Sequence, residues 1–334
     1  MITPLLPNLP EGHVPFHGTM NVQDQGLHGP HVTILMCTYN GERFLSQQLD
    51  SLARQTYRNW SVVVSDDGST DATLEILRQY SALWGEGKFT LRQGPKRGFA
   101  ANFMSLACNP PTRSEFYAWA DQDDIWQDNK LETALKSLRD LPEQIPTLYC
   151  ARTELVSDAG GVIGCSPLFA RPASFANALV QSLAGGNTMV FNGAAQALFR
   201  VAGDYLDIVS HDWWAYLLVT GAGGQVIYDP APTILYRQHD ANLIGSDMGP
   251  RARLARLRMM LTGRFKGWNQ RNISALESVR SQLSEESLST LDLFQKARKS
   301  RGPARIIWLR RSGVYRQTLL GNLGLMLAAI INRI

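Results

Sequence analysis

The chain has 334 residues, 44% hydrophobic and 19% charged, which is typical of a folded protein and excludes a disordered one. The net charge of +4 is uneven: residues 251–334 carry 17 Lys and Arg against 4 Asp and Glu, a charge of +13, whereas residues 1–249 carry −9. The four cysteines are scattered and form no C-x-x-C pair, which disfavours a zinc site or a disulfide framework. Neither a secretory signal nor an apolar run of about 18 residues is found.

Residues 1–30, rich in Pro, Gly, His and Asn, are expected to be a disordered leader. Beyond it, apolar runs that predict buried strands alternate with helical patterns. The expected strands are Val32–Cys37, Trp60–Ser65, Lys88–Arg92 and Phe116–Ala120, and the helices between them have apolar positions within 44–53, 74–80 and 98–107. Thr70 or Asp71 is expected to cap the second helix. This alternation predicts a doubly wound α/β sheet with helices on both faces.

The pattern is less regular after residue 141. The residues predict strands at Thr147–Arg152 and Gln225–Tyr228, a hairpin turn at Asp158–Gly161, a loop leading into a helix over Ser182–Arg200, and an aromatic helix at His211–Val219. From Arg251 onward the chain is expected to be helical and basic, with no further strand.

Two of the predicted strands end in acidic loops. Asp66 and Asp67 follow the second strand, and Asp121, Asp123 and Asp124 follow the fourth. Because ligands of such sheets bind outside the carboxyl ends of the strands, these carboxylates are expected at one site. They repel one another unless a cation compensates, and carboxylate oxygens suit Mg²⁺ or Mn²⁺, which also accept phosphate oxygens. The pattern therefore predicts a metal-assisted diphosphate site.

No glycine-rich phosphate loop is found, since neither G-x-x-x-x-G-K-[ST] nor G-x-G-x-x-G follows a predicted strand. A bound diphosphate would therefore be held by the metal and by Lys or Arg side chains. Lys96, Arg97 and Arg237 are the candidates, and a solvated surface charge is the alternative for each.

Three ordered motifs resemble those of the family 2 glycosyltransferases, which have the GT-A fold with a mixed sheet. They are MCTYNG at 36–41, VSDDGSTD at 64–71 and ADQDDIW at 120–126. Two later segments, HDWW at 211–214 and YRQH at 236–239, resemble the rhamnosyltransferase-like branch, which builds bacterial surface polysaccharides. The resemblance extends from Val32 to about Gly245.

The resemblance implies a donor site and a metal site. The implied donor-binding residues are Thr38, Tyr39, Asn40, Glu42, Asp66, Asp67, Arg97, Asp121 and Arg237. Among them, Asp67 would bind the pyrimidine base and Asp121 would lie near the ribose. Asp123 would ligate Mn²⁺ or Mg²⁺ on the donor diphosphate, with His239 as a second candidate ligand. Family members more often have a small residue at the position of Gln122.

Asp212 matches the position of the family's general base, which takes a proton from the acceptor hydroxyl during an inverting transfer. Many members have Glu-Asp where this chain has His211-Asp212, so no carboxylate acts at position 211. The implied acceptor residues are Asp124, Trp126, Asn187, Thr188, His211, Trp213 and Trp214. The two adjacent tryptophans would stack on sugar rings, and packing in the core is the alternative for each.

The C-terminal region mixes basic and apolar residues, with Trp308 among them. Basic amphipathic helices carrying Trp suit an anionic membrane surface. A solvated face of a helical subdomain is an alternative, whereas no nucleic-acid-binding fold accompanies the charge. The expected divisions are a GT-A catalytic domain over 31–248, with a nucleotide-binding half (31–126) and an acceptor-binding half (127–248), and a membrane-associating region over 249–334.

Together the motifs predict an inverting, metal-dependent glycosyltransferase that uses a dTDP- or UDP-sugar, with dTDP-L-rhamnose implied by the resemblance. Its acceptor would be a lipid-linked surface glycan such as O-antigen, at the cytoplasmic face of the inner membrane. One alternative is a non-catalytic sugar-binding or polysaccharide-assembly scaffold. The other is an HD-type phosphohydrolase, suggested by His211-Asp212 and His239-Asp240, which would need further His ligands; the other histidines all lie within residues 13–31.

Overall fold

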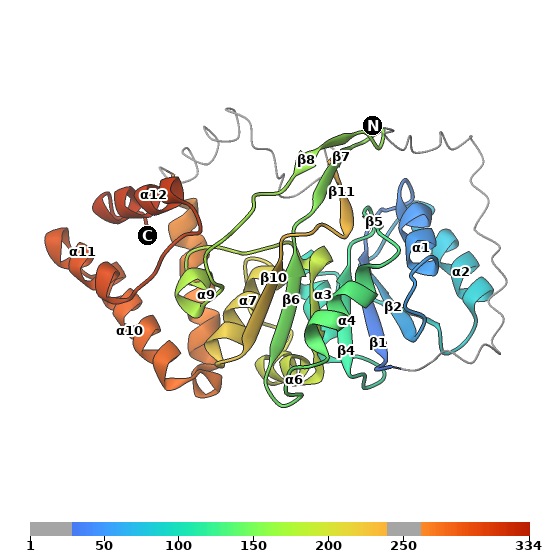
Figure 1. The fold of residues 1–334 in the computed structure, drawn as a ribbon, viewed down its shortest axis with the longest axis horizontal. Coiled ribbons are helices and arrows are strands. Elements are labelled where there is room, and N and C mark those ends of the chain that lie inside the picture. Colours follow the sequence, from blue (N-terminus) through green and yellow to red (C-terminus); the bar gives the residue numbers. More distant parts are fainter. Residues whose placement is uncertain (1–28, 239–261) are drawn as a thin grey trace.

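A computed structural model describes residues 29–238 and 262–334. Its main sheet has seven strands in the order β10-β6-β9-β4-β1-β2-β3 (Figure 1). The parallel half contains β1 (Val32–Thr38), β2 (Trp60–Asp66), β3 (Phe89–Gln93) and β4 (Phe116–Ala120). Every residue of β1 and β2 is buried, so the strands are apolar on both faces, as the continuous apolar runs predict.

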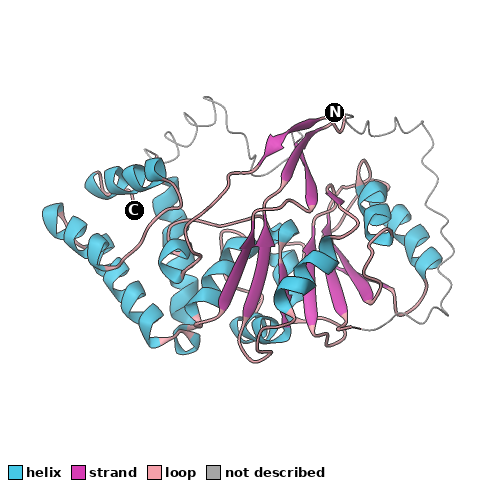
Figure 2. Ribbon diagram, viewed as in Figure 1, coloured by secondary structure: helices cyan, strands magenta, loops and turns pink. Residues whose placement is uncertain are grey.

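Helices cover both faces of this sheet (Figure 2). The helices of the first half are α1 (Leu45–Ala53), α2 (Thr73–Trp84), α3 (Phe99–Cys108) and α4 (Lys130–Leu138). Alternate residues of β1 enter different cores, since Ile34 packs in the cluster that contains α1, whereas Leu35 packs in the cluster that contains α3. The expected doubly wound arrangement is therefore confirmed. The expected capping of α2 by Thr70 or Asp71 is not confirmed. The helix begins at Thr73, so Ala72 occupies its N-cap position.

The second half completes a mixed sheet. It contains β6 (Thr147–Ala151), α5 (Phe175–Ala178), the short helix η1 (Gly186–Thr188), β9 (Val190–Asn192), α6 (Gly193–Ala202), α7 (His211–Gly221) and β10 (Gln225–Asp229). Strand β9 runs antiparallel to both β4 and β6. It lies in the segment expected to be a loop, because three residues are too few to show a periodic pattern.

A second, four-stranded sheet lies beyond the carboxyl ends of the parallel strands (Figure 1). Its order is β5 (Ile125–Trp126), β11 (Ile234–Gln238), β7 (Glu154–Ser157) and β8 (Val162–Cys165). The expected turn at 158–161 joins β7 to β8, which pair antiparallel. Strand β11 pairs with β5, so the segment after the acidic loop of β4 is held at this edge.

The C-terminal part consists of helices α9 (Arg264–Ser278), η2 (Arg280–Gln282), α10 (Glu285–Lys299), α11 (Gly302–Arg311) and α12 (Leu319–Ile330). Leu276, Phe294 and Ala329 of these helices belong to the same buried cluster as Trp214 of α7. None of the helices within 29–238 and 262–334 has the length and apolar character needed to cross a bilayer. The expected leader up to residue 28, His239 and the expected boundary after residue 248 lie outside the described residues.

Candidate active site

The ends of β1 and β2 are joined by the side chain of Asp66. Its Oδ2 accepts hydrogen bonds from Thr38 Oγ1 (2.8 Å) and Ser69 Oγ (2.6 Å), and its Oδ1 accepts from the backbone N–H groups of Gly68 and Ser69. Both Asp66 and Thr38 are buried. These two side chains therefore shape the loop that carries Asp67, and their contact with the donor stays a prediction.

Asp67 connects this loop to the segment before α3. Its carboxylate accepts hydrogen bonds from the backbone N–H groups of Lys96 (2.6 Å) and Gly98 (2.9 Å). Each carboxylate oxygen keeps a second lone pair, so a further donor, such as a base N–H, can still bind there. Lys96 itself is exposed, and its side chain lies next to Gly68 in the acidic loop.

Gln122, at the position where the resemblance favours a small residue, binds the backbone of Tyr39. The amide of Gln122 accepts from the N–H of Tyr39 (2.9 Å) and donates to its carbonyl (3.0 Å). Gly41 provides the space, because a Cβ atom there would lie 2.3 Å from Gln122 Oε1. The side chain of Tyr39 remains 58% exposed and is available to a ligand.

Asn40 and Glu42 bind the loop before α2. Asn40 Oδ1 accepts from the N–H of Thr70 (2.9 Å), and Glu42 Oε2 accepts from the N–H of Ala72 (2.9 Å). Asp71 accepts in return from the N–H of Glu42. Both predicted donor residues are exposed, and they fix the geometry between the first two strand ends.

Three carboxylates from two distant segments meet beyond β4. Loss of solvent, together with the charges of Asp123 and Asp212, raises the pKa of Asp121 to about 8. Asp212 reaches this group from the first turn of α7, where its Oδ1 accepts from the N–H of Trp213 (2.7 Å). Burial raises the pKa of the neighbouring Tyr236, and the negative charges of Asp124 and of the three clustered aspartates raise it further. The expected base therefore lies beside the expected metal-binding aspartates.

Asp124 and Trp126 lie beneath this cluster. Asp124 is buried, and its Oδ2 accepts from Asn187 Nδ2 (2.6 Å). Lys130 Nζ lies 3.8 Å from the ring centroid of the buried Trp126, and burial lowers the pKa of Lys130 to about 7, against the opposing effect of the Asp124 charge. Thr188 is also buried. This buried layer supports the loop from within, and acceptor contact by Asp124, Trp126, Asn187 and Thr188 stays a prediction. No sequence pattern pointed to Lys130, because a lysine at the start of a helix is normally exposed.

The residues that flank Asp212 belong to the core. His211 stacks on Phe103 at a centroid distance of 3.9 Å, and a Cβ atom on Gly186 would lie 2.1 Å from its Nε2. Burial lowers the pKa of His211 to about 4, so the ring is neutral at pH 7. Trp213 and Trp214 are buried, and Trp213 Nε1 donates to the carbonyl of Ala178 (2.7 Å). The two tryptophans pack in the core, which is the alternative considered for each, and acceptor contact by these three side chains stays a prediction.

The two predicted arginines bind protein groups. Arg237 is 4% exposed and donates to the carbonyls of Asp123 (3.3 Å) and Asp158 (3.0 Å) and to Gln47 Oε1 (2.7 Å). It therefore positions the backbone of the acidic loop, and its direct contact with the donor stays a prediction. Arg97 is exposed, donates to the carbonyl of Asp204 (3.1 Å), and lies 4.2 Å from the ring centroid of Tyr205.

The carboxylates fit a divalent cation that is shared with a diphosphate. Within the described ranges, no group of three or more His, Cys, Asp or Glu is arranged to hold a metal ion, and His239 lies outside them. Mg²⁺ at nucleotide sites needs only one or two protein carboxylates, with phosphate and water oxygens as its other ligands. Asp121 and Asp123 meet that requirement, and their mutual repulsion is the electrostatic condition that a cation relieves.

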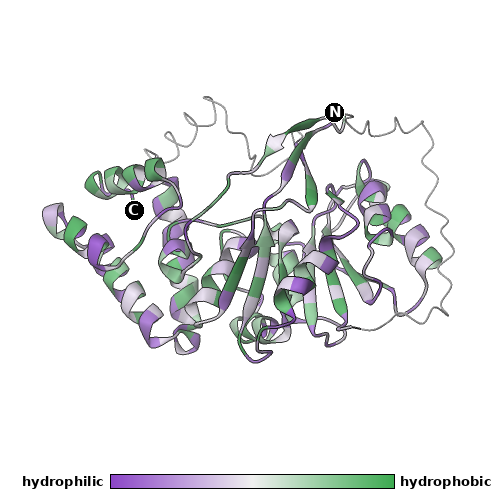
Figure 3. Cartoon of the chain, viewed as in Figure 1, coloured by the Kyte–Doolittle hydropathy of each residue, from purple (hydrophilic) through white to green (hydrophobic). Residues whose placement is uncertain are grey.

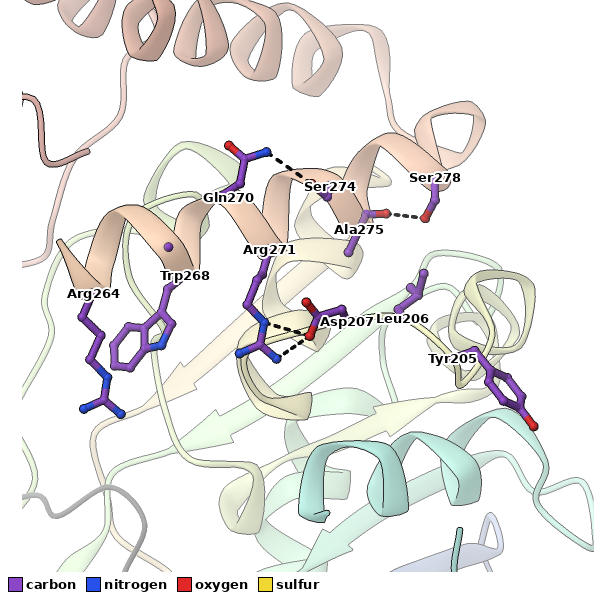
Figure 4. Close-up of a pocket in the computed structure, with 11 residues that line it drawn as sticks. Tyr205, Leu206, Asp207, Arg264, Trp268, Gln270, Arg271, Ser274, Ala275 and Ser278 are labelled. Atoms are coloured by element: carbon purple, nitrogen blue, oxygen red, sulfur yellow. Dashed lines mark hydrogen bonds and ion pairs between the residues drawn. The ribbon is translucent and has the colours of Figure 1, made fainter. Parts of the chain in front are cut away.

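A cavity of about 740 Å³ lies between the loop at 205–207 and α9 (Figure 4). Arg271 of α9 donates to Asp207 Oδ1 (2.9 Å) and to the carbonyl of Ile208 (2.5 Å), four residues before Asp212. Trp268, also on the cavity wall, packs edge-on against Trp213 with 6.2 Å between ring centroids. Tyr205 lines the cavity and contacts Arg97. The cavity therefore adjoins both the loop at Arg97 and the start of α7.

Comparison with known proteins gives the family. Residues 33–161 match the sequence model of glycosyl transferase family 2. The dTDP-rhamnosyl transferase RfbG of Shigella flexneri is 28% identical over 232 residues, 66% of this chain and 78% of that protein. The UDP-Glc:alpha-D-GlcNAc-diphosphoundecaprenol beta-1,3-glucosyltransferase WfgD of Escherichia coli is 33% identical over 118 residues, 35% of this chain and 44% of that protein. A solved structure of S. aureus TarS 1-349 with UDP-GlcNAc aligns with a TM-score of 0.49 at 17% identity, covering 85% of this chain and 93% of that one.

The mixed sheet with acidic groups at its strand ends, together with these relatives, makes the protein a glycosyltransferase of the GT-A fold. Residues 33–161 of it carry a glycosyl transferase family 2 domain.

Proposed function

We propose that the protein transfers L-rhamnose from dTDP-L-rhamnose, with inversion, to a hydroxyl of a lipid-linked surface glycan such as O-antigen at the cytoplasmic face of the inner membrane. The observation that carries the proposal is the meeting of Asp212 with Asp121 and Asp123 beyond the strand ends. The relative named a dTDP-rhamnosyl transferase supports the donor. The relative named for a diphosphoundecaprenol-linked acceptor supports a lipid-linked glycan.

Asp212 acts as the general base in this proposal. It takes the proton of the acceptor hydroxyl while that oxygen bonds to the anomeric carbon and the bond to the nucleoside diphosphate breaks. The first turn of α7 fixes Asp212 on a rigid, buried helix, which holds the carboxylate in one position. Tyr39, Asp67 and Lys96 remain at the surface around the acidic cluster to bind the donor.

Asp123, with Asp121 beside it, would hold Mn²⁺ or Mg²⁺. When bound, the cation neutralises charge on the departing diphosphate. Arg237 contributes by fixing the carbonyl of Asp123. Removal of divalent cations with EDTA should weaken donor binding in calorimetry, and unchanged binding would argue against the metal.

The cavity between the loop at 205–207 and α9 is proposed as the route by which the acceptor glycan reaches Asp212. Its walls supply aromatic faces at Tyr205 and Trp268, and polar groups at Arg264 and Gln270. Aromatic and polar groups together suit sugar rings, which have apolar faces and hydroxyl edges. The connection of Trp268 to Trp213 supports this placement, because Trp213 directly follows Asp212.

The direct test is Asp212→Asn. Transfer should fall by about 10²–10⁴-fold, the usual contribution of a general base, while the dissociation constant for the dTDP-sugar changes little. Release of dTDP and the anomeric configuration of the product, measured by NMR, give the two readouts. Wild-type turnover in Asp212→Asn would remove Asp212 as the base. Asp292→Asn, at an exposed aspartate of α10 that is paired with Arg280, is a control that keeps the acidic cluster and the cavity intact.

A further inference from the structure

Helix α12 exposes a row of large aliphatic side chains. Those with the greatest exposure are Leu319 (78%), Leu320 (73%), Leu323 (58%), Leu327 (45%) and Ile330 (67%). Leu320, Leu323, Leu327 and Ile330 are spaced by three or four residues, which places them along one face of the helix, with Leu319 at its start. The helix contains no charged residue, and its apolar character is visible in Figure 3. Single exposed leucines are common on protein surfaces, but a continuous apolar row marks an interaction surface.

The opposite face of α12 is anchored to the protein. Leu325, Ala328 and Ala329 are buried in the core shared with α7. The buried guanidinium of Arg305 on α11 donates to the carbonyl of Ala329 (2.9 Å). Thr318 caps the helix by accepting from the N–H of Gly321. The aliphatic row is therefore held outward by a fixed helix.

The surroundings of this row are strongly basic. Residues 293–334 contain nine Lys and Arg and no Asp or Glu. Six of these cations are exposed: Lys296, Lys299, Arg301, Arg310, Arg311 and Arg333. Ile307 of α11 adds another exposed aliphatic side chain between them in sequence. An apolar helix face in a segment whose charged side chains are all positive complements the acyl chains and phosphate groups of an anionic bilayer.

We propose that α12 lies in the plane of an anionic phospholipid membrane, with its aliphatic row at the boundary between head groups and acyl chains. Its 12 residues are about 18 Å long, too short to span a hydrocarbon core of about 30 Å. In Figure 1, α12 lies on the same upper side of the molecule as the small sheet beyond the strand ends. The inference rests on the proposed function in that a lipid-linked acceptor is held in such a membrane.

The experiment is co-sedimentation of the full chain with vesicles of phosphatidylethanolamine and phosphatidylglycerol, and with neutral phosphatidylcholine vesicles. The test variant is Leu319→Ser/Leu323→Ser/Leu327→Ser. The matched control is Val162→Ser/Ile163→Ser/Leu168→Ser. The native side chains at these positions are 56–65% exposed and do not belong to the C-terminal helices. We expect at least a 10-fold loss of binding to anionic vesicles in the test variant and less than a twofold loss in the control. Circular dichroism establishes that both variants are folded.

Equal binding by the test variant and wild type, or no binding by wild type, would overturn the inference. Analytical ultracentrifugation tests the alternative partner. If the wild type does not bind vesicles but forms a dimer that the same substitutions dissociate, the aliphatic row is the contact surface for a second copy of the chain instead. Hydrolysis of dTDP-rhamnose without vesicles should be equal in wild type and test variant. Absence of hydrolysis in wild type would count against the proposed function and leave the vesicle result standing.

Discussion

Several polar residues of the motifs act through the protein rather than on a ligand. Asp66 and Arg237 are buried and use their hydrogen-bonding groups to join loops from different strands. A buried carboxylate or guanidinium must be paired, because burying it without partners destabilises the folded state by more free energy than one hydrogen bond contributes. Such residues are as necessary to the site as those that face solvent, and a motif alone does not separate the two groups.

The pairing of Gln122 with Tyr39 can be tested through Gly41. Gly41→Ala places a methyl group against the Gln122 amide, which must turn away and give up both hydrogen bonds to Tyr39. We expect a loss of about 1 kcal/mol in the free energy of unfolding and weaker donor binding. In a Gln122→Ala background, the same change at Gly41 should cost almost nothing. Urea unfolding of the wild type, the two single variants and the double variant measures the coupling between positions 41 and 122. An equal loss of unfolding free energy from Gly41→Ala in both backgrounds would contradict the predicted contact.

Neutral His211 predicts a loss of stability in acid. Its pKa is about 4 in the folded protein and about 6.5 when unfolded, so the unfolded chain binds more protons between these values. His211 should therefore lower the free energy of unfolding by about 2 kcal/mol between pH 7 and pH 5, while Asp121, with its raised pKa, contributes with the opposite sign. His211→Leu should lack this contribution. Leu77→Ala, a core truncation in the other buried cluster that does not titrate, should lower the stability equally at both pH values.

The partly or fully exposed site residues could be predicted better than the buried ones. The strand ends and the motifs place Tyr39, Asp121, Asp123 and Asp212 at one edge, and the acidic cluster is found there. The roles of Trp213 and Trp214 could not be predicted, because a tryptophan pair at a helix start has the same sequence pattern on a surface and in a core. Whether a side chain is buried depends on which distant segments pack against it, and the sequence does not show which segments these are.

Among the elements, long buried strands were predictable and short ones were not. The expected strand at Phe116–Ala120 has the bounds observed for β4. Strands β5 and β9 have only two and three residues and exist because distant segments pair with them. Helix α1 shows the same limit: its buried Ser51, and Gln55 just beyond its end, accept hydrogen bonds from the backbone N–H groups of Trp126 and Leu131, so a face expected to be apolar is partly polar.

Helix α9 should position the base through Arg271. In Arg271→Met, the loop at Asp207 and Ile208 loses its hydrogen bonds to α9, and Asp212 at the end of this loop becomes less fixed. We expect kcat to fall about 10-fold, with the donor dissociation constant unchanged, because small displacements of a catalytic group are costly. Arg280→Met is the matched control, since both arginines are about 40% exposed and paired with an aspartate. Equal kcat in the two variants would exclude the positioning role.

At the scale of the molecule, the basic C-terminal helices and the catalytic sheet share a core. Phe191 of β9, Trp214 of α7, Phe294 of α10 and Ala329 of α12 all belong to one buried cluster. The uneven charge of the chain, −9 over 1–249 and +13 over 251–334, therefore does not mark two separately packed bodies within the described residues. It separates an acidic site from a basic surface on one continuous core.

This shared core predicts that the protein unfolds as one unit. Far-ultraviolet circular dichroism and tryptophan fluorescence should give coincident transitions in urea, since loss of the C-terminal helices would expose the buried faces of α5 and α7. A chain that ends at residue 248 should be insoluble or unfolded, because Trp213 would lose its partner Trp268 and the adjoining core would lie open to water. Truncation therefore cannot separate membrane binding from folding, and point substitutions on α12 are needed for that purpose. A folded 1–248 fragment that binds the dTDP-sugar with wild-type affinity would show that the C-terminal helices are an independent unit.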